Sequence, residues 1–329
     1  MANWYNGGGA DNDVVLFSKI RLARNLADVP FKSKISPEVK RGTVKKLFAT
    51  VKNSELAGEF NLIDLNSASD IKAISYAEKQ AISPEFAREK GAFLLSNDEN
   101  ASVMLCEEDH IRMTAFAPGL DLKSAYERAN RIDDVFIGNL PIAFDERLGF
   151  LTASPMNIGT GMKASVGLHL PAIKENGGIG RLASMVGKLG ISLRPMYKEN
   201  GAFYVLTNQI SLGITEAAAI ENMNSVAAQI ILQERNLRET MKNSERWEDR
   251  LYRSMGTLKM ARKLGFAEFI SLISDVRLGV ALGFFETEVD TIGWLIHNLA
   301  DGTVLSDSQS EDSPELAPKL RAEIVRAKL

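Results

Sequence analysis

The sequence predicts an α+β protein that ends in an all-helical region. Up to about residue 240, short apolar runs typical of strands alternate with signals that start helices. Two of these signals are Ser-Pro-Glu triplets at residues 36–38 and 83–85, in which serine caps the helix and proline takes its first position. Beyond residue 240 the strand patterns stop, and apolar residues recur at helical spacing. We therefore expect a domain boundary near residue 241.

The same patterns predict the individual elements. Short apolar runs bounded by turn residues predict strands at 14–17, 92–95, 102–105, 150–151, 166–170 and 202–206. Helical spacing predicts helices that start at 36 and 83 and others over 121–136, 178–189, 215–237, 247–258, 269–282, 292–299 and 317–329. Residues 1–13 are rich in glycine and asparagine, and we expect a flexible lead-in there. The Ser/Asp-rich residues 302–314 are expected to form a poorly ordered linker.

Composition narrows the class of protein. The chain has 329 residues, of which 45% are hydrophobic, enough to build a sizeable core. A formal net charge of −3 gives no reason to expect nucleic acid or an anionic membrane as a partner. The single cysteine, Cys106, excludes a disulfide within the chain and fits a reducing compartment. We see neither a signal peptide nor an apolar run of about 20 residues, so we expect a cytoplasmic protein.

A glycine-rich turn lies at the centre of the chain. Between two apolar runs stand Asn157, Gly159, Thr160, Gly161 and Lys163. Glycine adopts backbone angles that other residues resist, so this turn could direct N–H groups toward an anion that Lys163 then meets as a point charge. An ordinary glycine turn between two strands is the alternative. The spacing of a Walker loop is absent.

Two charged segments are further candidates. Lys19 and Arg21 fall on one face if the first strand continues through them, although a solvated basic edge strand has the same pattern. Glu107, Glu108 and Asp109 follow an apolar strand directly, and Arg112 lies on the returning strand. Adjacent carboxylates repel one another unless a cation balances them, and such a carboxylate can serve as a base. A solvated acidic turn remains the alternative.

Together these motifs resemble the phosphagen (guanidino) kinase family, and within it the bacterial protein-arginine kinases. The resemblance covers residues 14–326 and rests on four segments, at 18–26, 107–112, 151–165 and 274–278. It implies a large antiparallel sheet flanked by helices in a catalytic domain over 14–240, followed by a helical domain over 241–329.

The resemblance also implies a chemistry, the transfer of the γ-phosphoryl group of ATP to a guanidinium nitrogen. Glu108 is then the expected base, with Glu107 supporting it and Glu199 as a second carboxylate on a mobile loop over 194–201. Ser154 stands where the family has a reactive cysteine. Nucleotide binding is expected of Lys19, Arg21, Gln80, Arg112, Asn157, Gly159, Thr160, Gly161, Lys163 and Arg194. No side chain is expected to bind a metal directly, because Mg²⁺ would be held through the phosphates.

Several positions depart from the family pattern. Lys19 and Lys163 replace arginines and lose the planar fork that grips two phosphate oxygens. Ser154 can donate a hydrogen bond but supplies no thiolate, and Gln80 stands where a histidine is common. Arg321 and Ala322 alone remain of a phosphoarginine-binding element in the last helix. These changes leave open a catalytically impaired pseudokinase, which would bind nucleotide or arginine-bearing proteins without turnover. A kinase for free arginine is less favoured, because the family's N-terminal helical domain is missing.

The resemblance implies partners as well. It suggests arginine-bearing protein substrates, an adaptor and a protease system in stress-linked quality control. The helical domain at 241–329 is expected to mediate homodimerisation and substrate docking.

Overall fold

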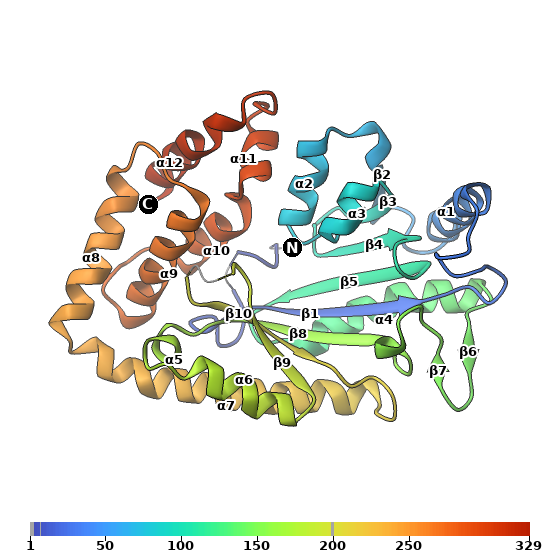
Figure 1. The fold of residues 1–329 in the computed structure, drawn as a ribbon, viewed down its shortest axis with the longest axis horizontal. Coiled ribbons are helices and arrows are strands. Elements are labelled where there is room, and N and C mark those ends of the chain that lie inside the picture. Colours follow the sequence, from blue (N-terminus) through green and yellow to red (C-terminus); the bar gives the residue numbers. More distant parts are fainter. Residues whose placement is uncertain (1–2, 7, 199–200) are drawn as a thin grey trace.

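The computed structural model describes residues 3–6, 8–198 and 201–329 and is built around one eight-stranded sheet (Figure 1). Every strand pairing in the sheet is antiparallel, in the order β2-β3-β4-β5-β1-β8-β10-β9. The strands are β1 (Val15–Arg24), β2 (Phe60–Asp64), β3 (Ala92–Ser96), β4 (Ala101–Leu105), β5 (Ile111–Pro118), β8 (Met162–His169), β9 (Ile191–Pro195) and β10 (Phe203–Asn208). A short hairpin, β6 (Phe144–Asp145) and β7 (Gly149–Phe150), stands apart. The expected large antiparallel sheet is confirmed.

Helices cover one face of this sheet, because the side chains of each strand point alternately to its two faces and one set is apolar. Ile20 and Leu22 of β1 belong to the main core, while Lys19 and Arg21, which alternate with them, project to the opposite face. The helices that contribute to the same core are α1 (Pro37–Lys52), α4 (Leu122–Asn139), α5 (Pro171–Glu175), α6 (Ile179–Lys188) and α7 (Glu216–Lys242). Two further helices, α2 (Asp70–Glu78) and α3 (Pro84–Glu89), form a smaller core with β3 and β4. They cover β3 and β4 on the face that carries Lys19, and the rest of that face beside them forms a cleft.

The C-terminal region is helical and packs beside the end of the sheet, in orange and red at the left of Figure 1. It consists of α8 (Glu245–Met260), α9 (Phe266–Leu282), α10 (Val289–Asn298), α11 (Asp301–Asp307) and α12 (Ala317–Lys328). Its core includes Phe203 of β10, so the two regions share a hydrophobic contact. The expected all-helical C-terminal region is confirmed. Among the described residues, no helix combines the length and the apolar character needed to cross a membrane.

The N-terminal segment is packed, which contradicts the expectation of a flexible lead-in over residues 1–13. Within its described part, Trp4 and Tyr5 are buried. Asp11 and Asp13 form ion pairs with Arg235 of α7, at 2.8 and 2.5 Å. The composition suggested flexibility, but the segment's aromatic and acidic residues find partners far along the chain. Residues 1, 2 and 7 lie outside the described part.

Residues 302–314 also differ from the expectation of a poorly ordered linker. Their first part belongs to α11, and Thr303, Val304 and Leu305 are buried. The cause is Glu78 at the end of α2, whose carboxylate accepts from the backbone N–H of Gly302 at 3.1 Å and of Thr303 at 2.7 Å. A carboxylate at a helix N-terminus satisfies N–H groups that otherwise lack partners. This long-range contact stabilises a helix that the local sequence does not favour.

Arg321 of α12 is a structural residue in this fold. Its side chain is fully buried, and each of its three nitrogens donates a hydrogen bond, to the carbonyls of Leu299 and Leu264 and to the carboxylate of Asp301. The guanidinium also lies over the Phe266 ring. Because its donors are engaged inside the protein, Arg321 is not open to a phosphoarginine ligand in this structure.

A buried ion pair joins the central strand to a covering helix. Arg24, the last residue of β1, pairs with Asp133 of α4 at 2.6 Å, and both side chains are almost fully buried. The Arg24 guanidinium also donates to the carbonyl of Thr160 at 2.9 Å and lies over the Phe150 ring. Arg24 therefore fixes the end of β1 against both α4 and the glycine turn.

Removing the Asp133 carboxylate should lower the stability of the fold. Asp133→Ala leaves a buried guanidinium without its anion, and we expect a loss of about 3–5 kcal/mol in the free energy of unfolding. Asp134→Ala is the matched control, because Asp134 is the exposed neighbour on the same helix. Chemical denaturation followed by circular dichroism measures both. Equal stability of the two variants would contradict this role of the ion pair.

Candidate active site

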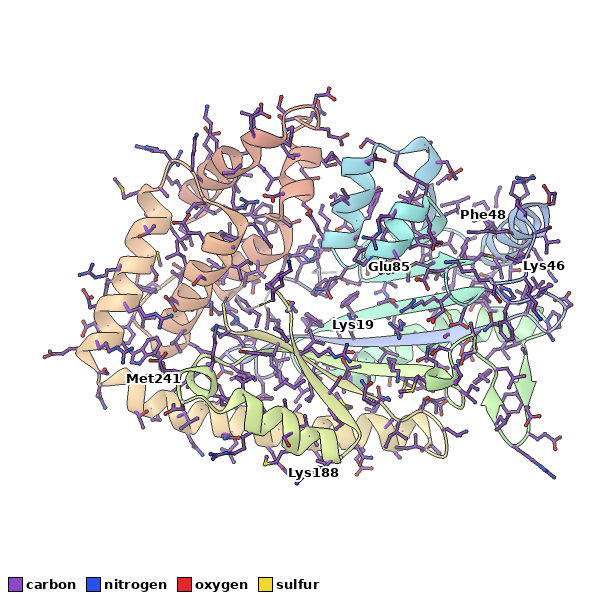
Figure 2. The ribbon with its side chains drawn as sticks, viewed as in Figure 1. Lys19, Lys46, Phe48, Glu85, Lys188 and Met241 are labelled. Carbon is purple, nitrogen blue, oxygen red and sulfur yellow. The ribbon has the colours of Figure 1, made fainter. Side chains whose placement is uncertain are left out.

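The open face of the sheet forms a cleft of about 460 Å³. Its floor comes from residues of six strands, β4, β5, β1, β8, β10 and β9, and its wall from the loop between α2 and α3. Cations of the floor are Lys19, Arg21, Arg112, Lys163 and Arg194, and hydroxyls are Thr114, Ser165, Ser192 and Thr207. Lys19 lies near the middle of the molecule, above β1 (Figure 2). The sheet thus gathers cations that are up to 175 positions apart in sequence, from Lys19 to Arg194.

Strand register explains why these side chains meet. Arg21 stands opposite Lys163 on β8 and opposite Thr114 on β5. Lys19 stands opposite Ser165 on β8. Because side chains two residues apart share a face, the period of two carries both cations of β1 into the cleft. The predicted common face of Lys19 and Arg21 is confirmed.

Positive charge in this cleft is crowded. Burial, and then the charges of Arg21 and Arg112, lower the pKa of Lys19 to about 8. Burial and Arg112 likewise lower the pKa of Arg21 to about 10. The pKa of Lys163 is lowered by burial and by Arg21. Among the described residues that line the cleft, none is acidic. Such a site favours a multiply charged anion, which would restore the charged forms.

Neutral groups hold the two lysines. The Lys163 ammonium donates to the carbonyls of Gln209 at 3.0 Å and Met156 at 3.3 Å. The Lys19 ammonium donates to Oε1 of Gln80 at 3.4 Å. These contacts orient the lysines without cancelling their charge, so both remain able to bind an anion.

The acidic turn after β4 has two carboxylates with different surroundings. Glu107 is buried, and its carboxylate accepts hydrogen bonds from Arg112, from the Ser83 hydroxyl at 3.1 Å and from the Glu108 N–H at 2.6 Å. Burial acts to raise the pKa of Glu107, but Arg112 and these hydrogen bonds outweigh it, so the pKa lies below its usual value. The Glu108 side chain is 45% exposed, and its nearest cation is Arg112 at 3.9 Å. Glu108 is therefore the accessible carboxylate beside the cleft.

Asp109 connects this turn to the segment that carries Ser154. One carboxylate oxygen, Oδ1, accepts from the Asn25 side chain at 2.6 Å and from the Ala153 N–H at 2.7 Å. Ser154 follows directly and is half-buried. Sequence reasoning did not assign this connecting role to Asp109. His110 is structural: its ring accepts from the Leu26 N–H and contacts the carbonyl of Pro30.

The glycine turn does not form the expected anion cradle. The N–H of Gly159 donates to Phe150 at 3.4 Å, and the N–H of Thr160 donates to Ser211 at 3.0 Å. A Cβ on Gly159 would lie 2.1 Å from the Ser211 carbonyl oxygen, so glycine is required for a close backbone approach. Of the residues expected to bind nucleotide, Asn157, Gly159, Thr160 and Gly161 lie outside the cleft lining, and they instead shape the chain that leads to Lys163.

The remaining expected residues divide into two groups. Gln80 lines the cleft from its wall, and Arg194 lines it from β9. Glu199 lies outside the described residues. The lining hydroxyls were missed by sequence reasoning, although Thr114 and Ser165 each stand two positions after a cleft cation, and that spacing is a signal that could have found them.

Comparison with known proteins identifies the family to which the chain belongs. Residues 42–237 match the family described as the ATP:guanido phosphotransferase C-terminal catalytic domain, and the chain belongs to this family. The fold agrees: a duplicated taurocyamine kinase from Schistosoma mansoni superposes with a TM-score of 0.63 at 23% identity. That match covers 74% of this chain and 37% of the kinase. Lombricine kinase superposes with a TM-score of 0.59 at 17% identity, covering 72% of each chain.

Sequence relatives then narrow the class to the protein-arginine kinases. Residues 244–329 match the protein-arginine kinase McsB C-terminal domain. The protein-arginine kinase of Clostridium acetobutylicum is 40% identical over 328 residues, which cover 97% of this chain and 96% of the relative. That of Bacillus subtilis is 38% identical over 295 residues, which cover 87% of this chain and 81% of the relative.

The Ser83 hydroxyl provides a test of how Glu107 is held. Ser83 and Ser36 cap α3 and α1 in the same way, accepting from Phe86 and Val39 respectively, but only Ser83 also donates to Glu107. Replacing either serine by alanine should cost about 1 kcal/mol of stability. Only Ser83→Ala should also slow phosphoryl transfer, on the order of 10-fold. Steady-state rates compare the two, and equal rates would show that the Glu107 contact is dispensable.

The pKa of Lys19 predicts proton uptake on nucleotide binding. With a pKa of about 8, Lys19 is mostly neutral at pH 9 in the free protein, and bound phosphates would favour its charged form. ATP affinity should therefore fall as the pH rises through 8, and binding at pH 9 should take up a proton. Calorimetry in two buffers of different ionisation enthalpy measures this uptake. The proton uptake should be smaller in Lys19→Met. It should be unchanged in the control Lys45→Met, because Lys45 is an exposed lysine. Binding without uptake would contradict the prediction.

Proposed function

We propose that this chain is an ATP-dependent protein-arginine kinase, which transfers the γ-phosphoryl group of ATP to the guanidinium group of arginine residues in proteins. One observation carries the proposal: a five-cation cleft lies beside a turn with one accessible carboxylate. Family membership and the identity of the relatives support the same reaction.

The donor side requires positive charge around the phosphates and accurate positioning. Lys19, Arg21, Arg112, Lys163 and Arg194 would bind the phosphate oxygens of ATP, since they line one cleft without an acidic lining residue among those described. These five cationic side chains fit a polyphosphate ligand. Mg²⁺, held through the phosphate oxygens, would supply further charge neutralisation when bound.

The acceptor side requires a carboxylate that holds the guanidinium and accepts its proton. We assign this role to Glu108, because Glu107 is already engaged by Arg112 and Ser83. The guanidinium nitrogen attacks the γ-phosphorus and forms the P–N bond, while the bond from phosphorus to the ADP oxygen breaks. The nitrogen's proton passes to the Glu108 carboxylate. Ser154 would contact the guanidinium as a hydrogen-bonding group, and Glu199 would be a second carboxylate.

Further parts of the proposal concern the cellular setting. We infer a cytoplasmic enzyme that acts in stress-linked protein quality control with an adaptor and a protease system. The helical region at 241–329 would mediate homodimerisation and substrate docking. These inferences rest on the resemblance to protein-arginine kinases. Light scattering of the purified chain tests the homodimer, and a monomer at all concentrations would exclude it.

Direct detection of phosphoarginine tests the activity. The chain would be incubated with Mg-ATP and an arginine-rich protein such as casein at neutral to basic pH, because P–N bonds are labile in acid. Mass spectrometry should then locate phosphoarginine. Glu108→Gln should reduce it at least about 100-fold, while Glu146→Gln, at an exposed hairpin position, should leave it unchanged.

Two negative outcomes have distinct meanings. Absence of phosphoarginine while ATP still binds would identify a pseudokinase. Equal phosphoarginine in wild type and Glu108→Gln would preserve the kinase and remove Glu108 as its base.

A further inference from the structure

An aromatic cluster lies next to Lys19 at the cleft. Trp4 of the N-terminal segment stacks on Phe116 of β5, with ring centroids 4.3 Å apart and an interplanar angle of 10°. Trp4 also packs edge to face with Phe17 of β1, with ring centroids 5.2 Å apart. Phe17 and Phe116 pack edge to face at 5.7 Å. The three rings form a continuous apolar platform on the open face of the sheet.

Lys19 lies over this platform. Strand register puts Lys19 directly opposite Phe116, and Phe17 is two residues before Lys19 on the same face. The Lys19 ammonium is 5.5 Å from the Phe116 centroid and 5.7 Å from the Phe17 centroid, within the range of cation–π attraction.

Lys19 needs such a partner because its other neighbours are unfavourable. Burial most of all, and then Arg21 on its own strand and Arg112 on β5, disfavour its charged form. Lys163 on β8 and Arg194 on β9 line the same cleft, and Glu107 is engaged by Arg112. Across the aromatic cluster, His297 of α10 is buried, which lowers its pKa to about 3 and leaves it neutral. In the described part of the chain, no carboxylate is within ion-pair distance of Lys19.

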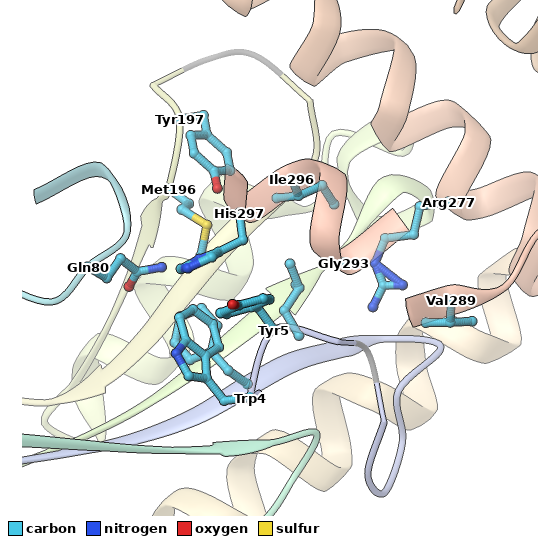
Figure 3. Close-up of a pocket in the computed structure, with 12 residues that line it drawn as sticks. Trp4, Tyr5, Gln80, Met196, Tyr197, Arg277, Val289, Gly293, Ile296 and His297 are labelled. Carbon is cyan, nitrogen blue, oxygen red and sulfur yellow. The ribbon is translucent and has the colours of Figure 1, made fainter. Parts of the chain in front are cut away.

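The N-terminal segment is anchored from two sides, so Trp4 has a defined position. The backbone N–H of Trp4 donates to Oδ1 of Asn100 at 2.8 Å. Its neighbour Tyr5 stacks on His297 of α10 at 3.9 Å. Figure 3 shows Trp4 and Tyr5 beside His297 and Gln80, and Gln80 is the residue that accepts from Lys19. The segment therefore links α10 to the wall and floor of the cleft.

We propose that Trp4 is a positioning residue for the nucleotide site: by packing against Phe116 and Phe17, it holds the aromatic platform that keeps the Lys19 ammonium charged and directed at the phosphates. The identity of the anion rests on the proposed function, but the contact between platform and lysine does not. In this account the N-terminal segment is part of the nucleotide site, although Trp4 touches no substrate.

The first test measures Lys19 itself, without nucleotide. The full chain labelled with [¹³Cε]lysine would be titrated by NMR, with Lys19→Met identifying the resonance. Trp4→Ala should move the Lys19 titration to lower pH, and Trp4→Phe should restore it largely. Trp247→Ala is the matched control, because it removes another buried tryptophan from a different core. It should leave the Lys19 titration unchanged.

The second test measures ATP binding by calorimetry. Trp4→Ala should weaken ATP binding about 2- to 30-fold, the range of a cation–π contact, with a larger loss at pH 8.5 than at pH 7. In a Lys19→Met background, Trp4→Ala should have no further effect. A purely structural role would weaken binding equally at both pH values and in both backgrounds.

Three outcomes would overturn the proposal. They are an unchanged Lys19 titration in folded Trp4→Ala, the same shift in Trp247→Ala, and an equal loss of ATP affinity in the Lys19→Met background. If Trp4→Ala fails to fold, Phe116→Leu answers the same question, because it removes the ring under Lys19 while keeping apolar volume. A chain that shows the Lys19 shift but makes no phosphoarginine would refute the proposed kinase activity and leave the positioning role intact.

Discussion

Positive charge concentrated on one face of the sheet is the constraint on which this structure depends. Lys19, Arg21, Arg112, Lys163 and Arg194 share a cleft, and burial together with mutual repulsion lowers the pKa of Lys19 and Arg21. Such a face is stable only if the strands beneath it are held firmly and neutral partners accept from the cations. The core helices, the Arg24–Asp133 pair and the aromatic platform serve these purposes. The unbalanced charge is left for a polyphosphate to neutralise.

The acidic turn divides two tasks between adjacent carboxylates. Glu107 is buried and engaged by Arg112, so it orients a cation of the cleft. Glu108, one residue later, is nearly half exposed and remains available to a guanidinium. Asp109 ties the same turn to the segment that carries Ser154. Three consecutive acids thus have different roles because their surroundings differ.

Much of this arrangement could be predicted from local patterns. The period of two in β1 predicted the common face of Lys19 and Arg21, and two Ser-Pro-Glu triplets predicted the starts of α1 and α3. Where prediction failed, a distant partner decided the outcome. Glu78 caps α11 from 224 residues away, and Trp4 finds Phe116 across the fold. At the glycine turn, the structure agrees with the alternative of an ordinary turn, because Gly159 permits a close approach to the Ser211 carbonyl that no local pattern reveals.

The most direct test of the central claim is a crystal structure of the chain with a bound non-hydrolysable ATP analogue. We expect the phosphates to lie over β1, β5, β8 and β9, with Arg21 and Lys163 in contact with their oxygens and the γ-phosphate facing the Glu108 turn. Phosphates bound elsewhere, such as at the N–H groups of the glycine turn, would contradict it.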